Sequence, residues 1–226
     1  MREAWKVYKN VFSQFSLANI FKLSTEGYFK ELESPLFIGK ESNVMTALTK
    51  DNERVIVKIY RLENCNFNRM YSYIKADQRY IHLKKSKREI VFAWTQREYR
   101  NLLMAQEVIA VPKPIALKYN IIVMSVVGND GPAPPLKNAF PKNPKAFFDE
   151  IVLTMKKLYH HGLVHGDLSE YNILNDKEKP VFIDFSQSTT TKSPNHVELL
   201  QRDIHNIVSF FKNNADEELL LKEIKK

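Results

Sequence analysis

Three polar side chains that could carry chemistry stand close together in the last third of the chain. Asp167 and Asn172 lie within the segment 164–174, and Asp184 directly follows the short apolar run 181–183. In phosphoryl transfer, a protein has to position an attacking hydroxyl and neutralise the charge that spreads over the phosphate oxygens. A carboxylate that accepts the hydroxyl proton and two oxygen ligands for Mg²⁺ would meet both needs.

The spacing assigns a role to each of the three side chains. We expect Asp167 to be the catalytic base, and Asn172 and Asp184 to be the metal ligands. A simpler interpretation is that Asp167 and Asn172 only cap turns, as Asp and Asn often do. That interpretation does not explain the second Asp at the end of an apolar strand, so we favour phosphoryl transfer.

A lysine on a predicted strand is the fourth candidate. Lys58 lies within the strand 54–60, where it is expected to bind nucleotide phosphates and to pair with a carboxylate on the next helix. By itself, the pattern equally indicates a lysine that extends from a half-buried strand into solvent, but the later motif favours the catalytic role. Glu89, Glu98 and Glu107 compete as its partner, and we prefer Glu98 because it lies in the middle of that helix.

Two further clusters carry weaker signals. His160, His161 and His165 are close enough to suggest zinc, but Gly162 interrupts the helix and no fourth ligand is near. We therefore expect His165 to order the catalytic loop by hydrogen bonding. A basic cluster is either an RNA-binding surface or a solvated face, and both interpretations stay open; its members are Lys75, Arg79, Lys84, Lys85, Lys87 and Arg88.

Hydrophobic periodicity predicts the elements that position these residues. We expect a helical segment within 5–32, with Gly27 where a helix would stop. Further helices are expected at 87–106, 145–161 and 199–212, and strands at 43–48, 54–60, 119–127 and 181–185. Residues 61–87 have no clean period, which predicts a mobile insertion or a loop that a partner orders. The segment 128–144 contains two glycines and five prolines, so we interpret it as a hinge between two lobes.

Composition limits the class of protein. The 226 residues are 44% hydrophobic with a formal net charge of +8, which predicts a folded chain with a plausible anionic partner. None of the six glycines forms a GxGxxG or GxxxxGK pattern, which excludes a Rossmann fingerprint and a Walker A loop. The single Cys65 excludes an internal disulfide. Because the amino terminus has no unbroken apolar core, we expect no signal peptide or membrane span and a cytoplasmic location.

Taken together, these segments resemble the RIO family of atypical kinases, and within it the Rio1 subfamily, over nearly the whole chain. The segment 38–44 resembles the family's phosphate loop, STGKEANV, although Phe37 and Ile38 replace its leading Ser and Thr. Further likenesses lie at 58–60, 94–102, 124–125, 132–134 and 184–188. The resemblance implies nucleotide contacts from Lys40, Glu41, Ser42, Val44, Lys58, Glu98, Met124 and Val126, and a phosphoaspartate at Asp184.

The resemblance also implies a fold and a function. We expect an α+β, two-lobed protein-kinase-like fold with a helical segment at 1–33, a small lobe at 34–126, a large lobe at 127–226, and ATP with Mg²⁺ or Mn²⁺ between the lobes. The implied function is a serine/threonine protein kinase and ATPase in small ribosomal subunit maturation. Its implied partners are a pre-ribosomal particle or ribosomal RNA and protein serines, including its own Ser86.

Two alternatives keep part of this chemistry. Small-molecule phosphotransferases of the aminoglycoside-kinase type also use His-Gly-Asp, a downstream Asn and an apolar-Asp strand, but they usually have a larger carboxy-terminal lobe. A non-catalytic ribosome assembly factor could use nucleotide only as a switch. The presence of Lys58, Asp167, Asn172 and Asp184 together argues against this second alternative.

Overall fold

The computed structural model describes residues 12–63, 65–80, 83–129 and 131–226. The chain divides into two compact units, of which the first comprises residues 1–99 and 114–126 and the second comprises residues 100–113 and 127–226. Within the described ranges, no helix has the length and apolar character needed to cross a membrane.

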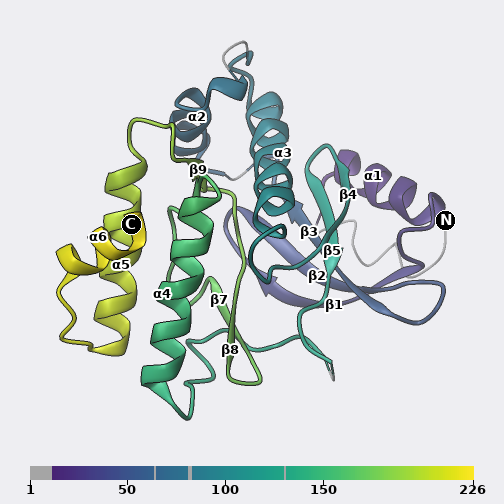
Figure 1. The fold of residues 1–226 in the computed structure, drawn as a ribbon. Helices are drawn as coiled ribbons and strands as arrows, with labels where there is room; N and C mark the ends of the chain where they lie inside the picture. Colours follow the sequence, from purple (N-terminus) through teal and green to yellow (C-terminus); the bar gives the residue numbers. More distant parts are fainter. Residues whose placement is uncertain (1–11, 64, 81–82, 130) are drawn as a thin grey trace. The chain divides into compact units, whose positions relative to one another are not determined.

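An antiparallel sheet organises the first unit (Figure 1). Its five strands are β1 (Glu31–Ile38), β2 (Ser42–Leu48), β3 (Arg54–Tyr60), β4 (Pro114–Lys118) and β5 (Ile121–Ser125), in the order β1-β2-β3-β5-β4. The central strand β3 places Lys58 opposite Val44 on β2 and Ile122 on β5. Because side chains alternate along a strand, Val57 and Ile59 face the hydrophobic core while Lys58 faces the other side.

Helix α1 (Gln14–Thr25) packs against the core face of this sheet. Ile20 and Leu23 are buried there with strand residues such as Val57. The predicted stop at Gly27 is confirmed: α1 ends at Thr25, and Gly27 takes a φ of 93° that side chains disfavour. The chain then enters β1 at Glu31. The part of the predicted helix at 5–11 lies outside the described residues.

The predicted insertion 61–87 contains regular structure. It includes helix α2 (Phe67–Lys75), whose Met70 and Ile74 are buried, and the 3₁₀ turn η3 (Gln78–Tyr80). Asp77 follows α2 and ties this segment to α3 (Lys87–Ala105), because its Oδ2 lies 3.5 Å from Nε of Arg97 on that helix. Burial lowers the pKa of Arg97 to about 10. The described part of the insertion therefore contains a helix and a 3₁₀ turn with buried anchors, where the sequence pattern indicated none. That the insertion is mobile or ordered by a partner stays a prediction.

Helices dominate the second unit (Figure 1). They are α4 (Pro144–His160), α5 (His196–Phe211) and α6 (Glu217–Lys225), and the last of these was not predicted. Two short two-stranded sheets accompany them: β6 (Leu163–Val164) pairs with β9 (Thr189–Thr190), and β7 (Ile173–Asp176) pairs with β8 (Lys179–Phe182). Asp167 and Asn172 lie on the loop between β6 and β7, and Asp184 lies just after β8.

The packing of α1 gives a stability prediction. Ile20 is fully buried against the sheet, whereas its neighbour Phe21 is 52% exposed. Ile20→Ala should lower the free energy of unfolding by about 2 to 5 kcal/mol, because it removes buried methyl groups and leaves a cavity. Denaturant unfolding would measure this, with Phe21→Ala as the matched control. Equal losses in the two variants would show that α1 contributes little to the core.

Candidate active site

A buried ion pair joins β3 to α3 in the first unit. Nζ of Lys58 donates to Oε1 of Glu98 at 2.7 Å, and the Tyr60 hydroxyl donates to Oε2 at 2.5 Å. The side chains of Lys58 and Glu98 are only 7% and 1% exposed. Because an unpaired charge at such a depth would be costly, each group requires the other. The competing Glu89 is exposed in the first turn of α3, and Glu107 pairs with His161 at 3.2 Å.

The predicted phosphate loop is a tight turn between β1 and β2. The backbone N–H of Gly39 donates to the carbonyl of Ser42 at 2.9 Å. A Cβ at position 39 would lie 2.5 Å from the exposed Phe37 ring, which would have to move, and 3.1 Å from the Ser42 carbonyl, so the turn favours glycine there. Lys40 is exposed at the tip of the turn, where it is accessible to an anion, and Glu41 is partly exposed beside it.

The other predicted nucleotide contacts of the first unit lie on its strands. Ser42 and Val44 belong to β2, directly after the turn. Met124 is buried on β5, opposite Ile56 of β3, and Val126 follows the end of β5. The structure therefore brings Val44 and Lys58 together, since they are direct partners across β2 and β3.

The carboxylate of Asp167 is held from several sides within the second unit. Nε2 of Gln187 donates to its Oδ2 at 2.6 Å, and the guanidinium of Arg202 lies 4.0 Å from its Oδ1. Nδ2 of Asn172 donates to the Asp167 carbonyl at 2.8 Å. The Asp167 side chain is still 38% exposed. It is thus a fixed carboxylate that a substrate hydroxyl can reach, as a general base requires.

The two predicted metal ligands lie on adjoining segments. The backbone N–H of Ile183 donates to the carbonyl of Asn172 at 3.0 Å, which ties the catalytic loop to the residue before Asp184. Because the Asn172 amide nitrogen faces Asp167, the side-chain oxygen is the atom suited to a cation. The Ser186 hydroxyl donates to Oδ1 of Asp184 at 2.7 Å. A carboxylate and an amide oxygen are hard ligands, so this donor set fits Mg²⁺.

His165 orders the loop that carries Asp167, as expected from the sequence. Its ring is buried; Nδ1 accepts from the Asp167 N–H at 3.3 Å, and Nε2 lies 3.0 Å from the Ile183 carbonyl. These two partners place the ring proton on Nε2. Among the described residues, no group of three or more His, Cys, Asp or Glu side chains is arranged to hold a metal ion.

Two buried residues that the sequence analysis missed hold this site. Asp203 on α5 accepts the Gly166 N–H at 2.7 Å and the Leu168 N–H at 2.8 Å. Asn101 on α3 donates to the carbonyls of Phe185 at 3.0 Å and Ser188 at 2.9 Å. The only signal in the sequence was a polar residue on the buried face of a predicted helix, which does not show where its partners lie.

The comparisons with known proteins agree with this arrangement. A family model described as "RIO domain" matches residues 43–224. The chain is 42% identical over 212 residues to "RIO-type serine/threonine-protein kinase Rio1" of Methanocaldococcus jannaschii, covering 93% of this chain and 73% of that protein. It is 38% identical over 215 residues to the protein of the same name from Haloferax volcanii, covering 94% and 74%.

A solved structure is similar in fold. It is the Rio2 kinase of Chaetomium thermophilum in its ADP/Mg²⁺-phosphoaspartate complex, with a TM-score of 0.73 and 23% identity. The match covers 95% of this chain and 68% of that one.

The environment of Asp203 gives a pH prediction. Burial raises the pKa of this carboxyl to about 7, although the two backbone amides and Arg202 oppose the rise. The folded state therefore binds a proton that the unfolded state releases near pH 4. The stability that Asp203 contributes should be greatest below about pH 4 and should fall as the pH rises to about 7.

Denaturant unfolding between pH 4 and 8 would test this, with Asp203→Asn as the variant that cannot titrate. The stability of the unsubstituted protein relative to Asp203→Asn should decline across that range. The exposed Asp149→Asn serves as the control. A relative stability that grows with pH would instead mean that the amides hold Asp203 as an anion.

Proposed function

This chain belongs to the RIO family, and we propose that it acts as a Rio1-type serine/threonine protein kinase that also hydrolyses ATP. The observation that carries the proposal is the fixed but accessible carboxylate of Asp167, which lies on a loop held by Asp203 and His165. Turns capped by Asp or Asn would not need a buried carboxylate and a buried imidazole to hold them in place.

Each residue has a role in the proposed reaction. Asp167 accepts the proton of the serine hydroxyl as its oxygen attacks the γ-phosphorus of ATP. Lys58, held in place by Glu98, neutralises charge on the phosphates. Asn172 and Asp184 would hold Mg²⁺, which when bound offsets the charge of the transferring phosphoryl group; Mn²⁺ would fit the same donors.

The phosphate loop and the end of β5 would bind the rest of the nucleotide. Lys40, Glu41, Ser42 and Val44 would surround the phosphates, with the backbone amides of the turn as donors. Met124 and Val126 would border the adenine, since the flat faces of the aromatic base favour apolar neighbours.

ATP hydrolysis would follow a second route from the same site. In it, the carboxylate of Asp184 attacks the γ-phosphorus, ADP leaves, and water later releases phosphate from the phosphoaspartate. The similar Rio2 structure is described as a phosphoaspartate complex, which supports this route as part of the proposal.

We propose a pre-ribosomal particle of the small subunit, or its RNA, as the partner. The supporting observation is that cations and aromatic rings alternate on the insertion: Lys85 lies 5.1 Å from the Tyr71 ring centre, and Lys87 lies 5.2 Å from that of Phe67. Basic side chains interleaved with aromatic rings suit unpaired RNA, which offers both phosphates and base faces. The net charge of +8 favours the same kind of partner.

The first functional prediction separates the two carboxylates. Asp167→Ala should reduce phosphotransfer by about 10² to 10⁴-fold, the usual contribution of a general base, while nucleotide binding stays near normal. Asp184→Ala should instead weaken Mg²⁺-dependent binding of nucleotide. Calorimetric titration and transfer of labelled γ-phosphate would measure the two effects, with the exposed Asp149→Ala as the control.

The acceptor offered in this assay distinguishes the alternatives. Label should appear on protein serine or as inorganic phosphate, and not on an aminoglycoside. Near-normal turnover by Asp167→Ala would remove Asp167 from the mechanism. Nucleotide binding without any turnover by the unsubstituted protein would favour a non-catalytic assembly factor.

The second functional prediction concerns Ser86. Its side chain is exposed and caps α3, because its hydroxyl accepts the Glu89 N–H at 3.3 Å. A phosphate at a helix amino terminus is favourable, and the neighbouring Lys85 and Lys87 would add to that effect. Mass spectrometry after incubation with Mg·ATP should find phosphate on Ser86, and the exposed Ser72 is the comparison site on α2. Labelling of other serines with Ser86 consistently unmodified would reject this assignment.

A further inference from the structure

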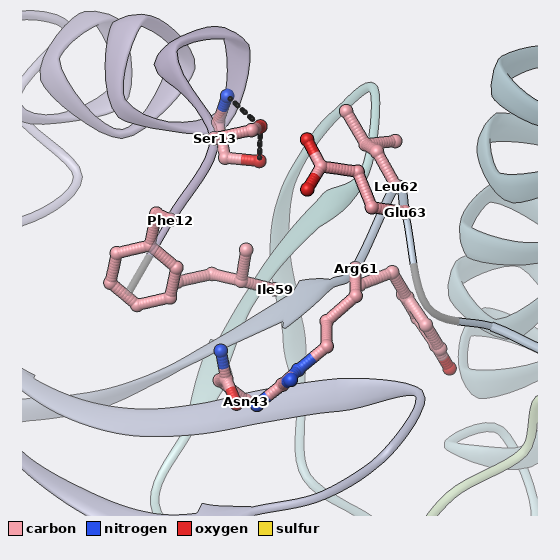
Figure 2. Close-up of a pocket in the computed structure, with 9 residues that line it drawn as sticks. Phe12, Ser13, Asn43, Ile59, Arg61, Leu62 and Glu63 are labelled. Atoms are coloured by element: carbon pink, nitrogen blue, oxygen red, sulfur yellow. Dashed lines mark hydrogen bonds between the residues drawn. The ribbon is translucent and has the colours of Figure 1, made fainter. Parts of the chain in front are cut away.

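A cavity of about 70 Å³ opens beside the amino-terminal end of α1 in the first unit (Figure 2). Its lining residues are Phe12, Ser13, Ser16, Asn43, Ile59, Tyr60, Arg61, Leu62 and Glu63. None of the residues assigned above to nucleotide or metal binding lines this cavity. It therefore calls for an explanation of its own.

The floor of the cavity presents hydrogen-bond donors. Asn43 is 1% exposed, and its Oδ1 accepts from Nη2 of Arg61 at 3.0 Å. Because a guanidinium can only donate, the oxygen of the Asn43 amide has to face Arg61. The NH₂ group then points away from Arg61 (Figure 2). Within the described residues, both Nδ2 of Asn43 and Nε of Arg61 are buried without a hydrogen-bond partner.

The opposite wall is the amino terminus of a helix. Ser13 caps the 12-residue α1: its hydroxyl accepts from the Ser16 N–H at 3.2 Å and lies 3.0 Å from the Ser16 hydroxyl. The first turn of α1 contains no acidic residue, so its partial positive charge is not offset within the helix. The cavity thus combines a guanidinium, an unpaired amide donor and a positive helix end.

We propose that this cavity binds a small oxyanion, that is, a phosphate ion or a carboxylate group. Such a ligand lies in the field of the helix end and Arg61. Both unpaired donors are almost fully covered, so binding includes a side-chain shift that turns them toward the anion. The cavity is larger than a single water molecule, whose share of liquid volume is about 30 Å³. Glu63 is the one carboxylate among the lining residues, and it lies where it would weaken the binding of an anion.

The site also adjoins the phosphate loop. Asn43 directly follows Ser42, and the backbone N–H of Arg61 donates to the Glu41 carbonyl at 2.9 Å. The same two residues that provide the donors of the cavity therefore also border the turn at 39–41. The oxyanion site is nevertheless separate from the proposed kinase chemistry and does not require it.

The test follows the side-chain amide of Asn43 and the Nε–H of Arg61 by two-dimensional ¹⁵N NMR of the full chain. The protein is first saturated with Mg²⁺ and a non-hydrolysable ATP analogue, so that added anions do not enter the nucleotide site. Titration with inorganic phosphate, at an ionic strength held constant with chloride, should shift both signals along one saturating curve. A parallel titration with acetate distinguishes the sources: tighter phosphate binding assigns the free ion, and tighter acetate binding assigns a carboxylate group.

Matched variants locate the response. Arg61→Met keeps an apolar stem but removes the donors, and should weaken binding about tenfold or more. Glu63→Gln should tighten it by removing the opposing charge. Arg54→Met is the control, because Arg54 lies at the start of β3, is 51% exposed and pairs with Glu33.

Two results would overturn the proposal. One is that neither signal moves in the unsubstituted protein, a result that depends on no variant. The other is that folded Arg61→Met binds phosphate as tightly as the unsubstituted protein, since the ion would then lie elsewhere. If Arg61→Met fails to fold, an unchanged affinity in Glu63→Gln would count against the cavity in the same way.

Discussion

The carboxylate of Asp203 accepts the backbone amides of Gly166 and Leu168, the residues on either side of Asp167. Asp203 is 1% exposed, so its burial is costly unless both amides are present. The loop in turn depends on Asp203. The N–H groups of Gly166 and Leu168 are buried, so water cannot replace Asp203 as their acceptor. Helix α5 and the loop that carries Asp167 therefore form as one structure, and the position of the proposed catalytic carboxylate follows from that dependence.

Glycine at position 166 makes this arrangement possible. Its φ is 77°, and a Cβ there would lie 3.0 Å from the Gln187 carbonyl. The loop thus passes close to the segment after Asp184, where Gln187 donates to the Asp167 carboxylate. Asn101 holds the same segment from α3 through two carbonyls. The second unit fixes its proposed catalytic groups mainly by hydrogen bonds between buried side chains and loop backbone, since its short two-stranded sheets offer few ladder hydrogen bonds.

The first unit also buries charged groups. There, two opposite charges offset each other's cost of burial. Lys58 and Glu98 are both buried, and the Tyr60 hydroxyl occupies the remaining carboxylate oxygen. A buried ion pair seldom adds net stability compared with apolar residues of similar size. Its presence is better explained by the need for a lysine held at a fixed place on β3. The anchor between Asp77 and Arg97 at the base of the insertion shows that this unit buries charge at a second point.

The sequence by itself determined the local features of this protein: the strand that carries Lys58, the helix before the catalytic loop, and the residues Asp167, Asn172 and Asp184. These features depend on hydrophobic periodicity and on short spacings between residues, and both can be read directly from the sequence. Only the tertiary structure decided β1, whose outer half is exposed and shows no alternation, and α2, which buries just two side chains. It also determined the roles of Asn101 and Asp203, because their hydrogen-bond partners are distant in the sequence. The partners of Asn101 lie 84 and 87 residues away, and those of Asp203 lie 37 and 35 residues away. The role of a buried polar residue depends on its hydrogen-bond partner, and when that partner is distant in the sequence only the folded structure identifies it.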